Sequence, residues 1–90
     1  MRYELEIPGY SSERGLTLVW EPGSVISVDE RDRRVVLHAN RAGLVSLARH
    51  LLTLAQEGVP SGHHVHFDES NALEPGSVEL VLGLASDGSR

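Results

Sequence analysis

Histidines give this 90-residue chain its most distinctive chemistry. Residues 63–66 read His-His-Val-His, and Asp68 follows two positions after His66. Alternate side chains of a strand point to one face, so His64, His66 and Asp68 are predicted to form a row. Imidazole nitrogens and carboxylates bind zinc or iron. Cross-strand hydrogen bonding and contact with a protein partner use the same groups, and histidines can also lie on a strand without a specific role. The spacing alone does not choose among these alternatives.

A metal site would need a third ligand from a neighbouring element. His38 shares the same face by strand parity, but the sequence does not identify the neighbour that would supply this ligand. We therefore name His64 and His66 as the candidate metal ligands and predict no cofactor. The chain has no nucleophile elbow, no glycine-rich phosphate loop and no metalloprotease helix motif, so no catalytic residues and no enzymatic activity are predicted.

Composition restricts the partners. Thirteen Asp and Glu residues oppose eight Arg, giving a net charge of −5, and there is no cysteine and no lysine. An acidic chain is unsuited to nucleic acid or anionic lipid, whereas it attracts a basic protein; simple solubility is the other meaning of such a charge. No apolar run approaches the roughly 20 residues that span a bilayer. We expect a cytoplasmic protein, and the absence of lysine suggests a GC-rich bacterial genome.

One helix is predicted from Asn40, a good N-cap, to Gly58, which suits a left-handed C′ position. At 100° per residue, its apolar residues gather on one side, which we expect to be buried. The apolar set is Leu44, Leu47, Ala48, Leu51, Leu52, Leu54 and Ala55, with Val45 at its margin. The polar set, expected to face solvent, is Ser46, Arg49, His50, Thr53, Gln56 and Glu57. Gly43 is expected to mark close packing.

Period-two alternation predicts six strands around that helix. They are expected at residues 2–7, 16–20, around Ile26 and Val28, and at 34–38, 63–68 and 78–84. The order ββββαββ predicts an α+β fold: a two-layer sandwich with a mainly antiparallel sheet of about six strands and the helix on one face. We expect residues 1–85 to form one domain and 86–90 a flexible tail. The segment Glu21–Val25 recurs as Glu74–Val78, which indicates one Pro-Gly turn used twice.

Residues on the sheet face that the helix leaves open are the predicted binding site. Parity assigns several residues to this face, and we name as the binding set His38, His64, His66, Asp68, Val36 and Val81. Charged side chains alternate there with valines, a mixture that suits a protein partner, either a different protein or a second copy in a homodimer. Because histidine titrates near neutral pH, such an interface would be sensitive to pH.

Three segments carry a resemblance to a known family. They are Asn40–Leu44 with the leucines that follow, His64–Asp68, and Leu73–Val81. Together, over residues 35–83, they resemble immunity protein family 32 of bacterial polymorphic toxin systems. The resemblance implies a cytoplasmic protein that binds and neutralises the secreted toxin encoded beside it. It implies no catalytic residues, and it leaves open whether the His64–Asp68 row contacts the toxin or maintains the fold.

Overall fold

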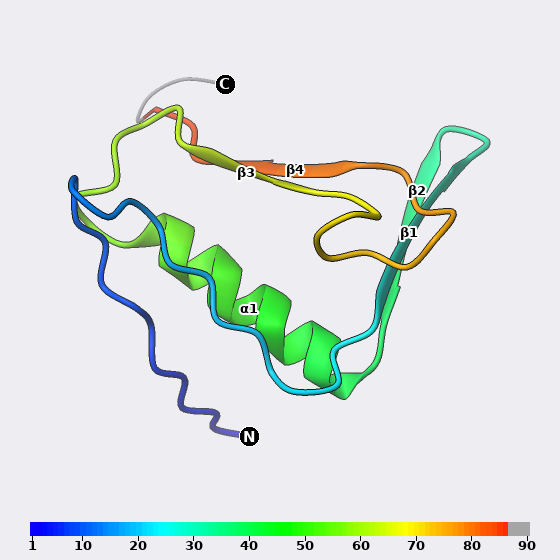
Figure 1. Cartoon of the computed structure of the whole chain (residues 1–90), viewed down its shortest axis with the longest axis horizontal. Helices are drawn as coiled ribbons and strands as arrows, with labels where there is room; N and C mark the ends of the chain where they lie inside the picture. Colours follow the sequence, from blue (N-terminus) through cyan, green and yellow to red (C-terminus); the bar gives the residue numbers. More distant parts are fainter. Residues whose placement is uncertain (87–90) are drawn as a thin grey trace.

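The computed structural model describes residues 1–86, and their elements confirm the α+β class. In chain order the elements are β1 (Ile26–Arg31), β2 (Arg34–Ala39), α1 (Arg41–Ala55), β3 (His64–Phe67) and β4 (Leu80–Gly83) (Figure 1). The tail predicted for residues 86–90 lies, apart from Ser86, outside the described residues. Within residues 1–86 no helix has the length and apolar character that a membrane crossing requires.

The prediction of one sheet of about six strands is wrong. The described residues form two separate antiparallel pairs, β1 with β2 and β3 with β4, so the element order is ββαββ. Residues 2–7 and 16–20 belong to neither pair and run as extended chain beside α1 (Figure 1). Their alternation reflects one side turned toward the protein and one toward solvent, which an unpaired segment also shows.

Polar side chains of α1 and of its C-cap residue, Gln56, take the place of strand partners for the N-terminal segment. Gln56 Oε1 accepts a hydrogen bond from the Tyr10 backbone N–H at 3.0 Å, and Gln56 Nε2 donates to the Pro8 carbonyl at 2.9 Å. Arg49 Nε donates to the Glu6 carbonyl at 3.1 Å. Main-chain groups need such partners wherever water is excluded. The helix thereby holds a segment that no sheet pairs.

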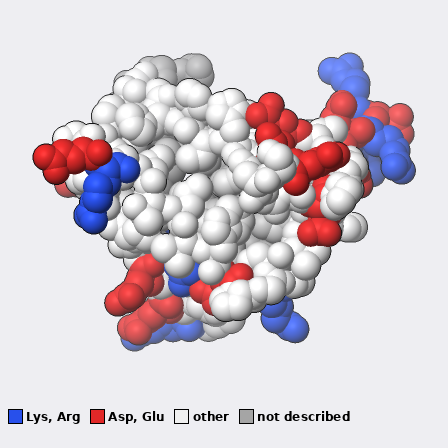
Figure 2. All heavy atoms as spheres, viewed as in Figure 1, with Lys and Arg blue, Asp and Glu red and all other residues white. Residues whose placement is uncertain are grey.

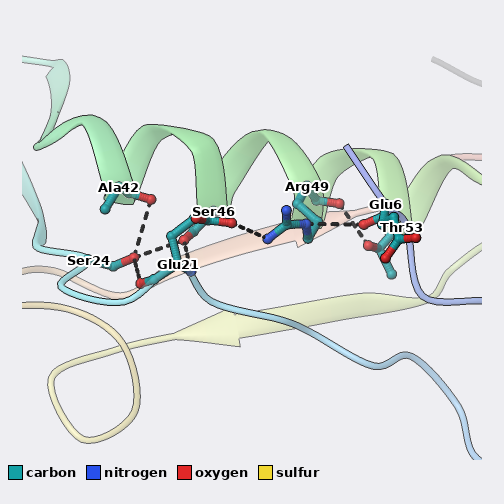
Figure 3. A network of polar contacts seen from close by, with 7 residues as sticks. All are labelled: Glu6, Glu21, Ser24, Ala42, Ser46, Arg49 and Thr53. Atoms are coloured by element: carbon teal, nitrogen blue, oxygen red, sulfur yellow. Dashed lines mark hydrogen bonds and ion pairs between the residues drawn. The ribbon is translucent and has the colours of Figure 1, made fainter. Parts of the chain in front are cut away.

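A second group of contacts ties residues 21–24 to the same side of α1 (Figure 3). Ser46 Oγ accepts from the Glu21 backbone N–H at 2.8 Å and lies 2.8 Å from Ser24 Oγ. The Glu21 carboxylate accepts from Arg49 Nη1 at 2.7 Å. Ser46 is fully buried and the Arg49 side chain is only 12% exposed, so these groups belong to the interior.

The predicted orientation of α1 is therefore wrong. The helix turns one arc inward, made of Gly43, Ser46, Leu47, His50, Thr53 and Leu54. Leu44, Leu51 and Leu52, expected to be buried, are about half exposed, at 52%, 51% and 49%. The side of α1 that is buried is determined by its polar contacts with residues 6–24 as much as by its leucines. The amphipathic pattern alone does not indicate this.

His50 was expected to face solvent and is instead 1% exposed. Its ring stands edge-on to Trp20, with centroids 4.2 Å apart, and lies 5.8 Å from the Phe67 ring. Neither ring nitrogen has a hydrogen-bond partner. Burial, aided by the neighbouring Arg49 charge, lowers the pKa of His50 from 6.5 to about 4, because a buried imidazole resists protonation.

The core lies where both hairpins meet α1. Its buried cluster consists of Ile26, Val28, Leu47, Phe67 and Leu73. Partly buried apolar residues of the predicted strands pack against it, including Leu18, Trp20, Leu37, Val65, Leu80 and Leu82. Tyr3 and Val35, which also lie in predicted strands, are instead exposed by 62% and 63%, because the unpaired N-terminus and the tip of the β1–β2 hairpin extend beyond the core.

The repeated Pro-Gly turn joins the two hairpins. Gly23 and Gly76 both have positive φ, 79° and 91°, as a type II turn requires at that position. The second copy then runs along β1: the Glu74 N–H donates to the Ile26 carbonyl and the Val78 N–H to the Val28 carbonyl, both at 2.8 Å. Both predicted turns are thus confirmed. The second turn also supplies hydrogen-bond donors to backbone carbonyls on the edge of β1 that does not pair with β2.

The start of α1 follows the prediction, and its end does not. Asn40 is the N-cap, and its side-chain oxygen accepts from the Gly43 N–H at 2.8 Å. A Cβ on Gly43 would lie 2.8 Å from the Val25 carbonyl oxygen, so the predicted close packing is confirmed. The helix ends at Ala55 with Gln56 extended, so Gly58, with φ of 95°, turns the following loop and does not cap the helix.

Candidate protein-binding surface

The outer face of the β3–β4 hairpin carries half of the predicted site. The register sets His66 opposite Val81 and His64 opposite Gly83, so these side chains share one face. The pairs that alternate with these along the strands, among them the pair of Phe67, turn toward the core. The His64 and His66 rings stand edge to face with centroids 4.9 Å apart. Strand parity therefore assigned this face correctly, with Val81 48% exposed beside the imidazoles.

Hydrogen bonds fix the orientation of both imidazoles. His66 Nδ1 lies 2.8 Å from Glu79 Oε2, and the two side chains are 51% and 52% exposed. His64 Nδ1 lies 3.0 Å from the Gly62 carbonyl oxygen, to which it donates when that nitrogen carries the proton. Glu79 lies two positions before Val81 and so shares its strand parity, but it was not among the predicted site residues. The prediction selected histidines, valines and Asp68, and it did not include the carboxylate that contacts His66.

Asp68 serves the loop after β3. Its Oδ1 accepts from the backbone N–H and from the hydroxyl of Ser70, at 2.9 and 2.7 Å, and these bonds lower the pKa of the Asp68 carboxyl. Its backbone carbonyl accepts from the N–H of Leu73 at 2.9 Å, closing the turn. Among the described residues no group of three or more His, Cys, Asp or Glu side chains could hold a metal ion.

His38 and Val36 lie on the other hairpin. They face Ser27 and Asp29 across β1 and β2, in a sheet separate from that of His64. A shallow groove of about 310 Å³ on that hairpin is lined by Asp29, Arg31, Asp32, Arg34, Val36 and His38. The residues predicted as one site therefore divide between two surfaces, because the single sheet that would unite them does not form.

Acidic side chains lie at one end of the β3–β4 face. In Figure 2 one group of Asp and Glu side chains lies on the right of the view, over the 68–79 loop and the β1–β2 hairpin, and others lie at the left and lower edges, whereas the centre is mainly uncharged. Exposed acidic members on these segments are Asp29, Glu30, Asp32, Glu69, Glu74 and Glu79. Glu69 is held by the Gly76 N–H, 2.8 Å from its Oε2. This part of the surface attracts a positively charged partner.

A second exposed surface lies on α1, where sequence reasoning expected core. We call it the outer stripe: Arg41, Leu44, Val45, Ala48, Leu51, Leu52 and Ala55, which lie within about 60° of Ala48 around the helix axis. Its first half borders a groove of about 450 Å³, whose other wall is Met1, Tyr3 and Leu5. Its second half carries the half-exposed Leu51 and Leu52. The apolar periodicity of the sequence did indicate this surface, but it was interpreted as a buried side of the helix.

Comparison with known proteins identifies the family. No curated protein and no solved structure matches the chain. The sequence profile described as Immunity protein 32 matches residues 34–85, which is more than half of the chain. The matched region runs from the start of β2 to just beyond β4 and so contains α1 and the β3–β4 face. The resemblance found in the sequence is thereby confirmed: the chain belongs to the immunity protein 32 family.

Proposed function

We propose that this protein neutralises a cognate bacterial toxin in the cytoplasm by binding it, without chemistry of its own. Membership of an immunity protein family supports a toxin-neutralising role. Within the described residues, the polar side chains of the candidate face bond to one another and to backbone, as in a recognition surface. Binding alone is enough for protection when the bound protein covers what the toxin needs to act.

The outer face of β3–β4 is the surface that we assign to the toxin. The observation that carries this choice is the His66–Glu79 pair, two exposed side chains oriented by the hydrogen bond between them, with Val81 beside them. An apolar centre next to charged groups held in place resembles the anatomy of protein interfaces, with an apolar core and a polar rim. Rigid side chains also lose less conformational entropy on binding.

The expected partner surface is basic. The net charge of −5 and the acidic side chains at one end of β3–β4 would steer a positively charged toxin to this face. Steering acts mainly on the association rate and weakens as salt screens the charges, over a Debye length of roughly 8 Å at physiological ionic strength. The association rate constant should therefore fall steeply with added salt.

The test begins with the toxin domain encoded next to this gene. Co-expression should rescue growth of cells that produce the toxin, and titration calorimetry should detect a complex. The variant Glu79→Lys reverses a charge beside the apolar centre of the face and should weaken binding by roughly tenfold or more, since like charges then meet in the interface. Glu13→Lys, the same change in the exposed 11–15 loop, is the control and should bind almost as well as wild type.

Two outcomes would contradict the proposal at different levels. Absence of both rescue and binding with every adjacent gene product would reject the toxin-binding function. Rescue that Glu79→Lys and Glu13→Lys reduce equally would keep the function and reject the β3–β4 face as its site.

A further inference from the structure

The outer stripe of α1 is unusual for a surface helix. A helix on a globular protein normally turns its apolar side inward and its polar side outward. Here the buried arc includes Ser46, His50 and Thr53, whereas Leu44, Leu51 and Leu52 are half exposed. A contiguous apolar patch on a surface usually marks an interaction site. The stripe is therefore a candidate interface with a second molecule.

We propose that the partner is a second copy of the chain, bound stripe to stripe with the two helices antiparallel and the two-fold axis beside Ala48. With a rise of ~1.5 Å per residue, Leu44 and Leu52 lie at equal heights, ~6 Å on either side of Ala48. The axis then sets Leu44 of one copy beside Leu51 of the other, and Val45 beside Leu52, because each pair lies on the same side of the stripe at nearly the same height. Such an interface is isologous, as a closed dimer requires.

The shape of the surface agrees with this pairing. The groove lies along the first half of the stripe, between Leu44 and the N-terminal residues Tyr3 and Leu5. The half-exposed Leu51 and Leu52 lie in the second half. Two-fold symmetry brings the leucines of each copy to the groove of the other. Ala48, one of the two alanines of the stripe with Ala55, lies at the crossing, where a small residue lets the backbones approach closely.

Charge selects the antiparallel arrangement. Arg41 lies in the first turn of α1, where the helix dipole is positive, and Glu57 follows the last turn, where it is negative. Each charge therefore lies at the end that disfavours it, and α1 has no acidic residue in its first turn and no basic residue in its last. An antiparallel copy would bring Glu57 and the negative end of its helix to Arg41. A parallel copy would instead bring like charges together.

The test is the mass of the wild-type protein and of matched variants. Size-exclusion chromatography with light scattering at roughly 100 µM protein would reveal a dimer whose Kd is about 10 µM or tighter. Wild type should have about twice the monomer mass of 9.8 kDa. Leu52→Glu should raise the Kd by at least roughly tenfold, because its carboxylate would be buried without a partner. Val81→Glu alters a side chain of equal exposure, 48% against 49%, on β4 and should remain dimeric.

A charge exchange tests the orientation. Arg41→Glu alone should weaken the dimer, and adding Glu57→Arg should restore it toward the wild-type Kd. Circular dichroism should show the helix retained in every variant, since all the altered side chains are exposed. A monomeric wild type would overturn the proposal, and so would a dimer that Leu52→Glu leaves intact or that Val81→Glu dissociates. A monomer whose toxin binding is lost in Leu52→Glu would assign the stripe to the toxin.

Discussion

Protonation of His50 is predicted to destabilise the folded protein. The imidazole is 1% exposed and unpartnered, and its pKa in the folded state is about 4 against an ordinary value of 6.5. Above pH 6.5 the imidazole is neutral in both the folded and the unfolded state, so its titration does not change the free energy of unfolding. Between pH 6.5 and 4 the unfolded chain binds a proton that the folded chain does not, so stability falls as pH falls. Below pH 4 both states are protonated and the loss is complete.

The size of the effect follows from the shift. At ~1.4 kcal/mol per pKa unit, the full loss approaches about 3 kcal/mol, and about 2 kcal/mol of it is reached between pH 7 and pH 5. A domain of this length has a free energy of unfolding of roughly 5–13 kcal/mol, so the change is a large fraction of the total. The melting temperature should fall by roughly 10 °C over the same interval.

The variant His50→Leu isolates this contribution. It removes two unsatisfied buried nitrogens, a gain of about 1–3 kcal/mol, and loses the edge-on contact with Trp20, a cost of about 0.5–1.5 kcal/mol. At pH 7 its free energy of unfolding should therefore equal or exceed that of wild type. At pH 5 it should be higher by a further ~2 kcal/mol, because the variant has no imidazole to protonate.

Urea denaturation provides the assay. Trp20 is the single tryptophan and stands 4.2 Å from the His50 ring, so its fluorescence reports on this part of the core, with circular dichroism as a second probe. His38→Leu removes an exposed imidazole and should keep the wild-type dependence on pH. Parallel curves of stability against pH for wild type and His50→Leu would refute the reasoning and indicate that another group controls the acid sensitivity.

Two further substitutions test backbone geometry. Gly43→Ala should lower the free energy of unfolding by about 1–2 kcal/mol, because its Cβ would lie 2.8 Å from the Val25 carbonyl oxygen. This clash outweighs the gain in helix propensity. A stabilised variant in urea titration would show that α1 moves aside freely. Arg33→Gly should raise the melting temperature by a few degrees, because Arg33 has φ of 62° in the β1–β2 turn, and Arg34→Gly, within β2, should lower it; the opposite order would contradict the claim of strain.

Local features of this fold could be predicted from sequence. Asn40 as N-cap, the two Pro-Gly turns and the facing of His64 and His66 all depend on residues within a few positions of one another. Parity within a hairpin also needs no distant information, which explains why Val81 was assigned correctly. The α+β class follows from these local patterns, and the family resemblance came from the same segments.

Pairing between distant segments could not be predicted. Residues 2–7 have the alternation of a strand, yet the carbonyls of Glu6 and of the following Pro8 accept hydrogen bonds from Arg49 and Gln56, more than 40 residues away. A side-chain amide or guanidinium that satisfies the main chain leaves no trace in hydrophobic periodicity. This wrong pairing also made two other predictions wrong. Without those segments no single sheet unites His38 with His64, and the polar side of α1 becomes its inner side.

The two proposed surfaces lie on opposite sides of the molecule, and this follows from contacts in the core. The inner face of β3 meets the inner arc of α1 through Phe67 and His50, whose ring centroids are 5.8 Å apart. The outer face of β3–β4 and the outer stripe of α1 must therefore point away from each other (Figure 1). A second copy on the stripe leaves His66 and Glu79 uncovered, so a dimer would present two toxin sites facing outward. Since Leu51 and Leu52 are half exposed and add only part of their apolar area to the core of a single chain, they contribute most once that dimer forms.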